Sequence, residues 1–278
     1  FFLLDNTEFV NAQEGIEFAI EVIQGNRNLK KFNWINNPIT SMDDAQKLVE
    51  AIIRHPLIDS IRLENCLGGD MNAYNVLRSL LASNKVLEHI DLESNNIRSG
   101  GGTDIPRFLA ANCPLTNLYL AKNHLDDTDT IMIARALKRN TNLQHLRLAQ
   151  NGITDIGRNA LRDVIFDSTS LNAVADSNHS CHVEDLDGIT NIVNTSPQVN
   201  RGRKIYSLLS SRNREGTNVR HLDSEFEDDD SLKLVPKVLE SVHVYAGYRP
   251  PATDYVHPLE IMYEILLSWK MPTLYENN

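Results

Sequence analysis

Residue types suited to metal binding gather at one place late in the chain, His179-Ser-Cys181-His182. Histidine and cysteine are the usual zinc ligands, but structural zinc sites use two separated pairs of them. This run offers no second pair. We therefore expect a turn in which Cys181 fills an apolar position, and we predict no metal.

Two further segments have compositions that could bind ions or phosphate. Asp223 to Asp230 holds six acids in eight residues but lacks the glycine and alternating acids of a calcium loop. We expect a solvated acidic loop there, with contact to a basic partner as the alternative. Ser99-Gly-Gly-Gly102 lacks the Lys-Ser/Thr of a phosphate-binding loop. The sequence also has no nucleophile elbow and no zincin helix, so we expect no enzyme activity and no cofactor.

Composition restricts the class of protein. The chain has 278 residues, 41% of them apolar, which is enough for one long core or two ordinary ones. Lys plus Arg number 27 against 37 Asp plus Glu, a formal charge of −10, so basic partners are favoured over nucleic acid or anionic membranes. Every apolar run is far shorter than a membrane-spanning helix requires, so no such helix is predicted.

Cysteine use and the first residue bear on the compartment. Three widely spaced cysteines do not form a disulfide framework, and they indicate reduced thiols in an intracellular setting, which we expect to be the cytoplasm. The chain begins without Met, so we expect it to be truncated. The nucleus and organelles therefore stay open as alternatives.

An internal repeat organises most of the sequence. Six similar segments begin at positions 29, 58, 87, 115, 143 and 171, so their spacing is nearly constant. The first, fourth and sixth positions are apolar, as in Leu87-Glu-His-Ile-Asp-Leu92. The ninth position is polar, and its residues are Asn37, Cys66, Asn95, Asn123 and Asn151. An amide there can bond the backbone groups of a buried turn.

The second half of each repeat changes to helical spacing. Ile133, Ala136 and Leu137 form an i, i+3, i+4 stripe, which predicts a helix with one apolar face. Asn112 and Asn140 lie just past two such helices, a place suited to left-handed backbone. Each unit has one apolar seam, so the units must stack to bury it.

The pattern L-x-x-L-x-L-x-x-N/C-x-L resembles the leucine-rich repeat. Its length and full helix resemble the ribonuclease-inhibitor-like class, which includes the repeat domains of Ran GTPase activators, tropomodulins and NOD-like receptors. The resemblance covers about residues 1–199. It implies an α/β solenoid curved like a horseshoe, with parallel strands on the concave face, helices on the convex face, and a protein bound on the concave face.

Three regions follow from the repeat. Residues 1–28 form a degenerate or truncated first repeat, and 29–199 hold six repeats, of which the last is degenerate. Residues 200–278 have helical spacing and form a predicted helical C-terminal cap with the acidic loop 223–230. The ending Trp269-Lys-Met-Pro-Thr-Leu-Tyr275 also resembles predicted diatom leucine-rich-repeat proteins.

The alternation of strand residues places a set of polar side chains on the concave face. Arg62, Asp91, Tyr119 and Arg147 share the central column, and neighbouring strands lie about 4.8 Å apart. The residues predicted to contact a partner are Arg62, Glu64, His89, Asp91, Glu93, Tyr119, His145 and Arg147. A solvated ladder of weak ion pairs is the alternative interpretation. His89 and His145 are two strands apart, about 10 Å, which is too far to share a metal.

The sequence therefore predicts a non-catalytic protein–protein interaction module, acting as a monomer or as a subunit of a hetero-complex. Two alternatives stay open. One is a regulator resembling the Ran GTPase activators, and the other is a structural subunit that uses its convex helices or its C-terminal helices inside a larger assembly.

Overall fold

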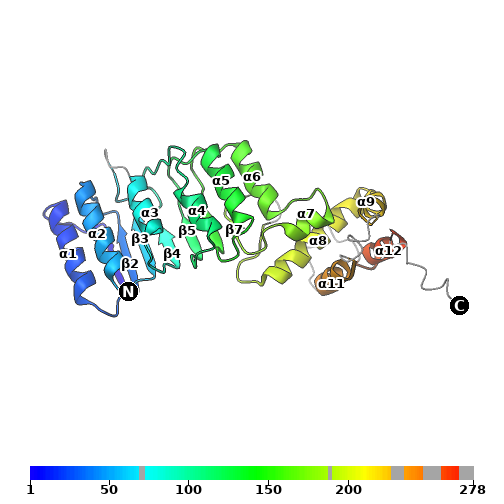
Figure 1. Ribbon diagram of the computed structural model, residues 1–278, viewed down its shortest axis with the longest axis horizontal. Helices are drawn as coiled ribbons and strands as arrows, with labels where there is room; N and C mark the ends of the chain where they lie inside the picture. Colours follow the sequence, from blue (N-terminus) through cyan, green and yellow to red (C-terminus); the bar gives the residue numbers. More distant parts are fainter. Residues whose placement is uncertain (69–72, 187–189, 227–234, 247–257, 269–278) are drawn as a thin grey trace. The chain divides into compact units, whose positions relative to one another are not determined.

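Seven parallel strands lie in chain order in one sheet, each paired with the next. The computed structural model describes residues 1–68, 73–186, 190–226, 235–246 and 258–268 (Figure 1). The strands are β1 (Phe2–Asp5), β2 (Lys31–Ile35), β3 (Ser60–Glu64), β4 (His89–Asp91), β5 (Asn117–Tyr119), β6 (His145–Arg147) and β7 (His182–Val183). This arrangement confirms the predicted α/β repeat solenoid.

A row of helices alternates with these strands (Figure 1). The helices are α1 (Ala12–Gly25), α2 (Met42–Arg54), α3 (Ala73–Ala82), α4 (Asp104–Ala110), α5 (Asp127–Leu137) and α6 (Asp155–Ile165). Several begin at an N-cap, and Asp126 and Asp129 form a capping box at α5. Among the helices that the structure describes, none is long and apolar enough to cross a membrane.

The core of the repeats is built from apolar columns that run across the strands. Phe32, Ile61, Ile90, Leu118 and Leu146 are paired in register from one strand to the next, and each has no exposed surface. The side chains stack because every repeat places its apolar residue at the same point of its strand. Each repeat therefore buries the apolar face of its neighbour.

The asparagines at the ninth position of the repeats join successive units, as their slot in the pattern predicts. Asn95 Oδ1 accepts hydrogen bonds from the backbone N–H groups of Cys66 and Leu67, at 3.0 and 2.8 Å. Its Nδ2 donates to the carbonyl oxygens of Leu63 and Glu93. One buried amide thus bonds four backbone groups of the turn, of which the Glu93 carbonyl also accepts from the Asn65 N–H.

The turn after the helix differs between the two positions predicted to be left-handed. Asn112 has φ 51°, as expected. Asn140 is not left-handed, so that prediction is wrong. It is buried, donates to the carbonyl of Leu109 and accepts from the N–H of Leu143. A short amide side chain can satisfy a helix end by hydrogen bonding instead of by a left-handed backbone.

The expected strand at Leu171–Asp176 is wrong, because these residues form the helix α7. Ser170 caps this helix by accepting from the N–H of Ala173, and Leu171 and Val174 bury one face of it. The spacing L-x-x-V fits a helical i, i+3 stripe as well as a repeat strand. The strand that follows β6 is β7, where His182 pairs with His145 after a longer stretch of chain than separates the earlier strands.

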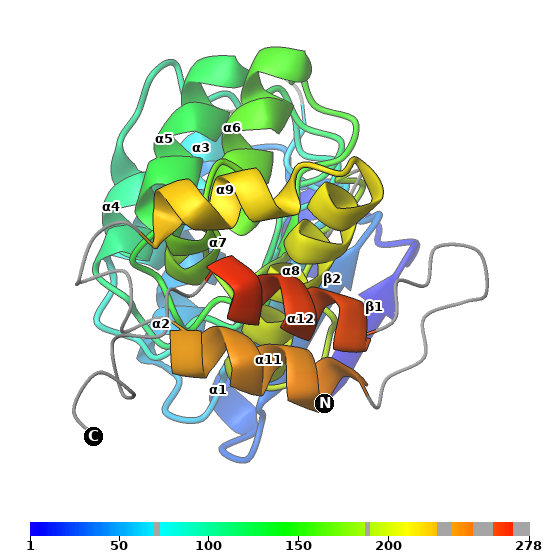
Figure 2. The same ribbon diagram turned by 90° about the vertical axis from the view of Figure 1, so that its right-hand side faces the viewer.

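The chain divides into two compact units. The first contains residues 1–164 and 180–193, and the second contains 165–179 and 194–278. The second unit holds α7, α8 (Pro197–Arg214), α9 (Asn218–Glu225), α11 (Val235–Ala246) and α12 (Pro258–Ser268). In this unit α11 lies beside α12 (Figure 2). The predicted C-terminal helices are therefore present, and α9 is an additional helix.

A buried lysine and a buried arginine help to organise the second unit. Lys204 has no exposed surface, and its Nζ donates to the carbonyl oxygens of Ile165 and Asn178. Arg212 pairs with Glu225 at 3.0 Å. Glu225 belongs to the acidic segment that was expected to be a solvated loop. Residues 223–225 are instead helical, Phe226 is buried, and 227–230 lie outside the described residues.

Candidate functional site

Four polar side chains cross the exposed face of the sheet in one column. Arg62, Asp91, Tyr119 and Arg147 are paired in register on β3, β4, β5 and β6. We call these four residues the charged strip. Each stands on a short strand that is hydrogen-bonded to strands on both sides, so the sheet fixes the spacing of the backbone beneath them.

One end of the charged strip is an ion-pair cluster around Arg62. The guanidinium contacts Asp91 Oδ2 at 3.1 Å, and its Nε donates to Glu64 Oε2 at 2.8 Å. Asp91 was expected on the exposed face, but only 3% of its surface is accessible, because Arg62 lies against it. The pattern of alternation gives the direction of a side chain, whereas its burial depends on what covers it.

The other end of the charged strip is a stack of rings and cations on Tyr119. The guanidinium carbon of Arg147 lies 4.3 Å from the centre of the Tyr119 ring, a cation–π contact. The His89 ring meets the same tyrosine edge-on at 4.9 Å. Arg147 also contacts Glu184 at 2.8 Å and Glu93 at 3.6 Å.

These side chains line a cavity of about 420 Å³ on the face of the sheet. Polar groups from five strands surround it, and its lining includes all four residues of the charged strip together with His89. Glu64, Glu93 and His145 are not part of the lining. Of the eight residues predicted to contact a partner, five therefore gather at one hollow and three lie beside it.

Burial changes the protonation of two groups in the cavity. Burial raises the pKa of Asp91 to about 6, with a smaller contribution from the Glu93 carboxylate, while the hydrogen bond from the Glu93 backbone N–H and the charge of Arg62 oppose this change. Burial lowers the pKa of His89 to about 4, with added repulsion from Lys31 and Arg62. His89 is therefore neutral at pH 7, and Asp91 gains a proton in mildly acidic solution.

Two residues of the face were missed by sequence reasoning. His182 follows His145 in its column, with ring centres 6.3 Å apart, and Glu184 contacts Arg147. Their position depends on the longer spacing before β7, and the repeat pattern gave no signal of it. Lys31 and Asn117 also line the cavity. Both lie in the column beside the charged strip, and neither was among the residues predicted to contact a partner.

The run of metal-ligand types near residue 180 is dispersed by the fold. Cys181 is fully buried, and burial also lowers the pKa of His179 to about 4. His182 lies on the sheet, where its Nδ1 is 2.9 Å from the carbonyl oxygen of Asn191. Within the described ranges, no group of three or more His, Cys, Asp or Glu side chains is placed to hold a metal ion.

Comparison with family models supports the repeat assignment. The family model described as "Leucine Rich repeat" matches residues 83–105 and 139–161. A similar solved structure is titled "Leiomodin-1 Actin-Binding Site 2 (ABS2)", with 13% identity, a TM-score of 0.32, and coverage of 75% of this chain and 95% of that one. No curated protein matches the chain. The family-model matches and the parallel sheet alternating with helices show a leucine-rich repeat solenoid, a fold that generally serves in protein interaction rather than catalysis.

Proposed function

We propose that the chain binds a partner protein on the exposed sheet face, with the charged strip at the centre of the contact. The observation that carries this proposal is the convergence of Arg62, Asp91, Tyr119 and Arg147 on one cavity. Tyrosine and arginine are the residues most enriched at the energetic centres of interfaces. Ion pairs and the ring stack already restrict these side chains, so less conformational entropy is lost when a partner binds.

The charge of the face favours a basic segment in the partner. Around the charged strip, two guanidinium groups contact four carboxylates, those of Glu64, Asp91, Glu93 and Glu184. The chain as a whole carries a formal charge of −10. Complementary charge raises the association rate and fixes orientation more than it adds affinity.

The proposal is tested by comparing proteins captured from source lysate by the wild-type chain and by a variant with alanine at the four positions of the charged strip. Circular dichroism first establishes that the variant folds. A partner that binds the wild type and is lost with the variant supports the proposal. Retention of every partner contradicts it.

A matched control separates loss of the site from a general effect of four substitutions. It carries alanine at exposed positions of the helices, namely Gln46, Arg107, Arg135 and Lys138. Binding should survive in this control. A partner lost equally from both variants would indicate a global effect, and the proposal would fail for that partner.

The two alternative roles give different results in the same assay. A structural subunit should lose partners on substitution of the exposed Leu259, Tyr263 and Leu266 of α12 and should tolerate changes in the charged strip. A GTPase-activating regulator should accelerate GTP hydrolysis by a captured GTPase. Passive binding should leave the hydrolysis rate unchanged.

The architecture also supports the finer assignment to the ribonuclease-inhibitor-like class. One strand alternates with one helix along the repeats, and almost the same length of chain separates each aligned strand from the next between β2 and β6. A full helix in the repeat is the feature that the chain shares with this class.

A further inference from the structure

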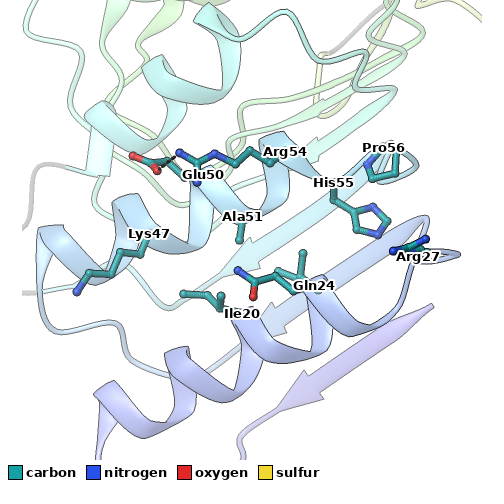
Figure 3. A pocket seen from close by; sticks show the side chains of 10 residues that line it. Ile20, Gln24, Arg27, Lys47, Glu50, Ala51, Arg54, His55 and Pro56 are labelled. Atoms are coloured by element: carbon teal, nitrogen blue, oxygen red, sulfur yellow. Dashed lines mark hydrogen bonds and ion pairs between the residues drawn. The ribbon is translucent and has the colours of Figure 1, made fainter.

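A second cavity lies in the helix layer, between α1 and α2, away from the charged strip. Its volume is about 720 Å³. Figure 3 shows side chains of the two neighbouring helices bordering it, with Ile20 and Gln24 from α1 and Ala51 from α2 near its middle. Nothing in the proposed interaction of the sheet face uses this groove.

The groove follows the axes of the two helices. The α1 residues in its wall are Ile20, Ile23 and Gln24, and the α2 residues are Lys47, Glu50, Ala51 and Arg54. Arg27 lies in the turn that follows α1. The α2 residues have the spacing i, i+3, i+4, i+7, which is one face of a helix about 10 Å long, and the α1 residues have the spacing i, i+3, i+4. Two such rows in parallel make an elongated trough that matches the shape of a third helix.

The lining combines an apolar floor with charged ends. Ile23 is buried at the floor, and the small side chain of Ala51 leaves the trough hollow at its centre. Lys47 stands toward one end and Arg27 toward the other (Figure 3). Arg27, Lys47 and Arg54 supply three positive charges against the single carboxylate of Glu50. Asp43 and Asp44, which lie outside the lining, both contact Lys47 and offset its charge.

The cations of the groove are available to a ligand. Lys47 pairs with Asp43 at 2.5 Å and with the less exposed Asp44 at 3.4 Å. Arg54 pairs with Glu50 at 3.0 Å, and the pairs with Asp43 and Glu50 are exposed. Exposed pairs of this kind are worth about 0 to 1 kcal/mol and exchange readily for another carboxylate. For Arg27, no ion-pair or hydrogen-bond partner is found in the part of the chain that the structure describes.

We propose that the groove between α1 and α2 binds an amphipathic helix of a partner protein, with apolar side chains on the floor and acidic side chains toward Arg27, Arg54 and Lys47. The trough is open to solvent along its outer side. A helix covers an open trough with its own outer surface, whereas a small molecule would stay largely exposed. Recognition of a helix by an apolar groove uses anchors at i, i+3, i+4 and i+7, which is also the spacing of the α2 residues in the wall.

The test is a selection from a display library of helical peptides, about four turns long, whose apolar and charged positions are randomised, using the full chain as bait. We expect the selected peptides to carry an apolar stripe with glutamate or aspartate toward both ends. Selection of peptides without acidic enrichment overturns the proposal, and so does a failure to select any peptide that binds the chain. Tighter binding of the probe dodecanoate than of the best peptide also overturns it.

Variants then locate the binding site. The double variant Arg27→Glu and Arg54→Glu should weaken the best peptide about tenfold or more, and lysine in place of the peptide's acids should restore binding to it. Ala51→Phe should block binding by filling the trough. The matched control Lys138→Glu with Arg139→Glu makes the same charge change at the end of α5 and should bind as the wild type does. Unchanged binding in both groove variants refutes the site.

Discussion

The clearest stability prediction concerns Asn95, the fully buried asparagine that joins the second and third repeats of the sequence pattern. Its amide satisfies the N–H groups of Cys66 and Leu67 and the carbonyls of Leu63 and Glu93. In Asn95→Ala three of these groups lose their partner while they remain among packed repeats, whereas the Glu93 carbonyl keeps the hydrogen bond from the Asn65 N–H. Each buried group without a partner costs about 1 to 3 kcal/mol.

Local relaxation recovers part of that cost, so we expect Asn95→Ala to lower the free energy of unfolding by about 4 kcal/mol. The matched control is Asn117→Ala. Asn117 is half-buried on the sheet face and bonds the Tyr119 hydroxyl at 3.0 Å. Its removal leaves groups that water can reach, and we expect a loss below about 1 kcal/mol.

Urea unfolding followed by circular dichroism measures both variants. Repeat proteins also open locally, so hydrogen exchange at the amides of Cys66 and Leu67 gives a second readout. We expect both amides to exchange faster in Asn95→Ala than in the wild type. Equal destabilisation by the two substitutions, with unchanged exchange at those amides, would refute the role assigned to the asparagine slot.

Three further predictions follow from single sites. Lys204→Met removes the Nζ group that donates to two buried carbonyl oxygens and should destabilise the second unit by about 2 to 4 kcal/mol in thermal unfolding; an unchanged melting temperature contradicts this role. The pKa of Asp91 is raised to about 6, so its protonated form stabilises the fold below pH 3.8, and this contribution is lost as the pH rises through 6. In Asp91→Asn this loss is absent. Between pH 4 and 6 the free energy of unfolding of the variant should therefore rise more steeply with pH, or fall less, than that of the wild type. Gly157→Ala places a Cβ 2.7 Å from an Asp127 oxygen and should lower the free energy of unfolding in urea by about 1 to 3 kcal/mol. In the control Gly25→Ala the new Cβ meets no atom within 4 Å, so that variant should be as stable as the wild type or slightly more stable.

The sequence was most informative where the spacing of apolar residues repeats. Leu118 and Leu146 illustrate this, because the same apolar position recurs one repeat later and becomes a paired, buried position of the sheet. The order of the polar columns follows from the same spacing. The sequence alone therefore predicts that Arg62, Asp91, Tyr119 and Arg147 are neighbours, and the strand pairing places them in one column.

Burial and contact on the face depended on side-chain conformation. The alternation of strand residues makes Asp91 an outward position, but Arg62 covers it and its pKa rises as a result of burial. The stacking of Arg147 on Tyr119 has a similar origin, since long side chains can follow several paths across the same sheet. The cavity in the helix layer depends on the small size of Ala51 and on the separation of two helices, neither of which a periodic pattern encodes.

By itself, the sequence determined the repeat, the parallel order of the strands and the set of residues sharing the sheet face, because periodic burial of apolar side chains constrains all three. Only the tertiary structure decided the end of the array. Leu171 and Val174 suit a strand or a helix equally by spacing, and the helix is chosen because its face packs into the second unit's core with Ile205 and Leu209. Because residues 171–176 form this helix, the next strand of the sheet begins at His182. The free energy that stabilises this arrangement comes from burying apolar side chains against residues far along the chain.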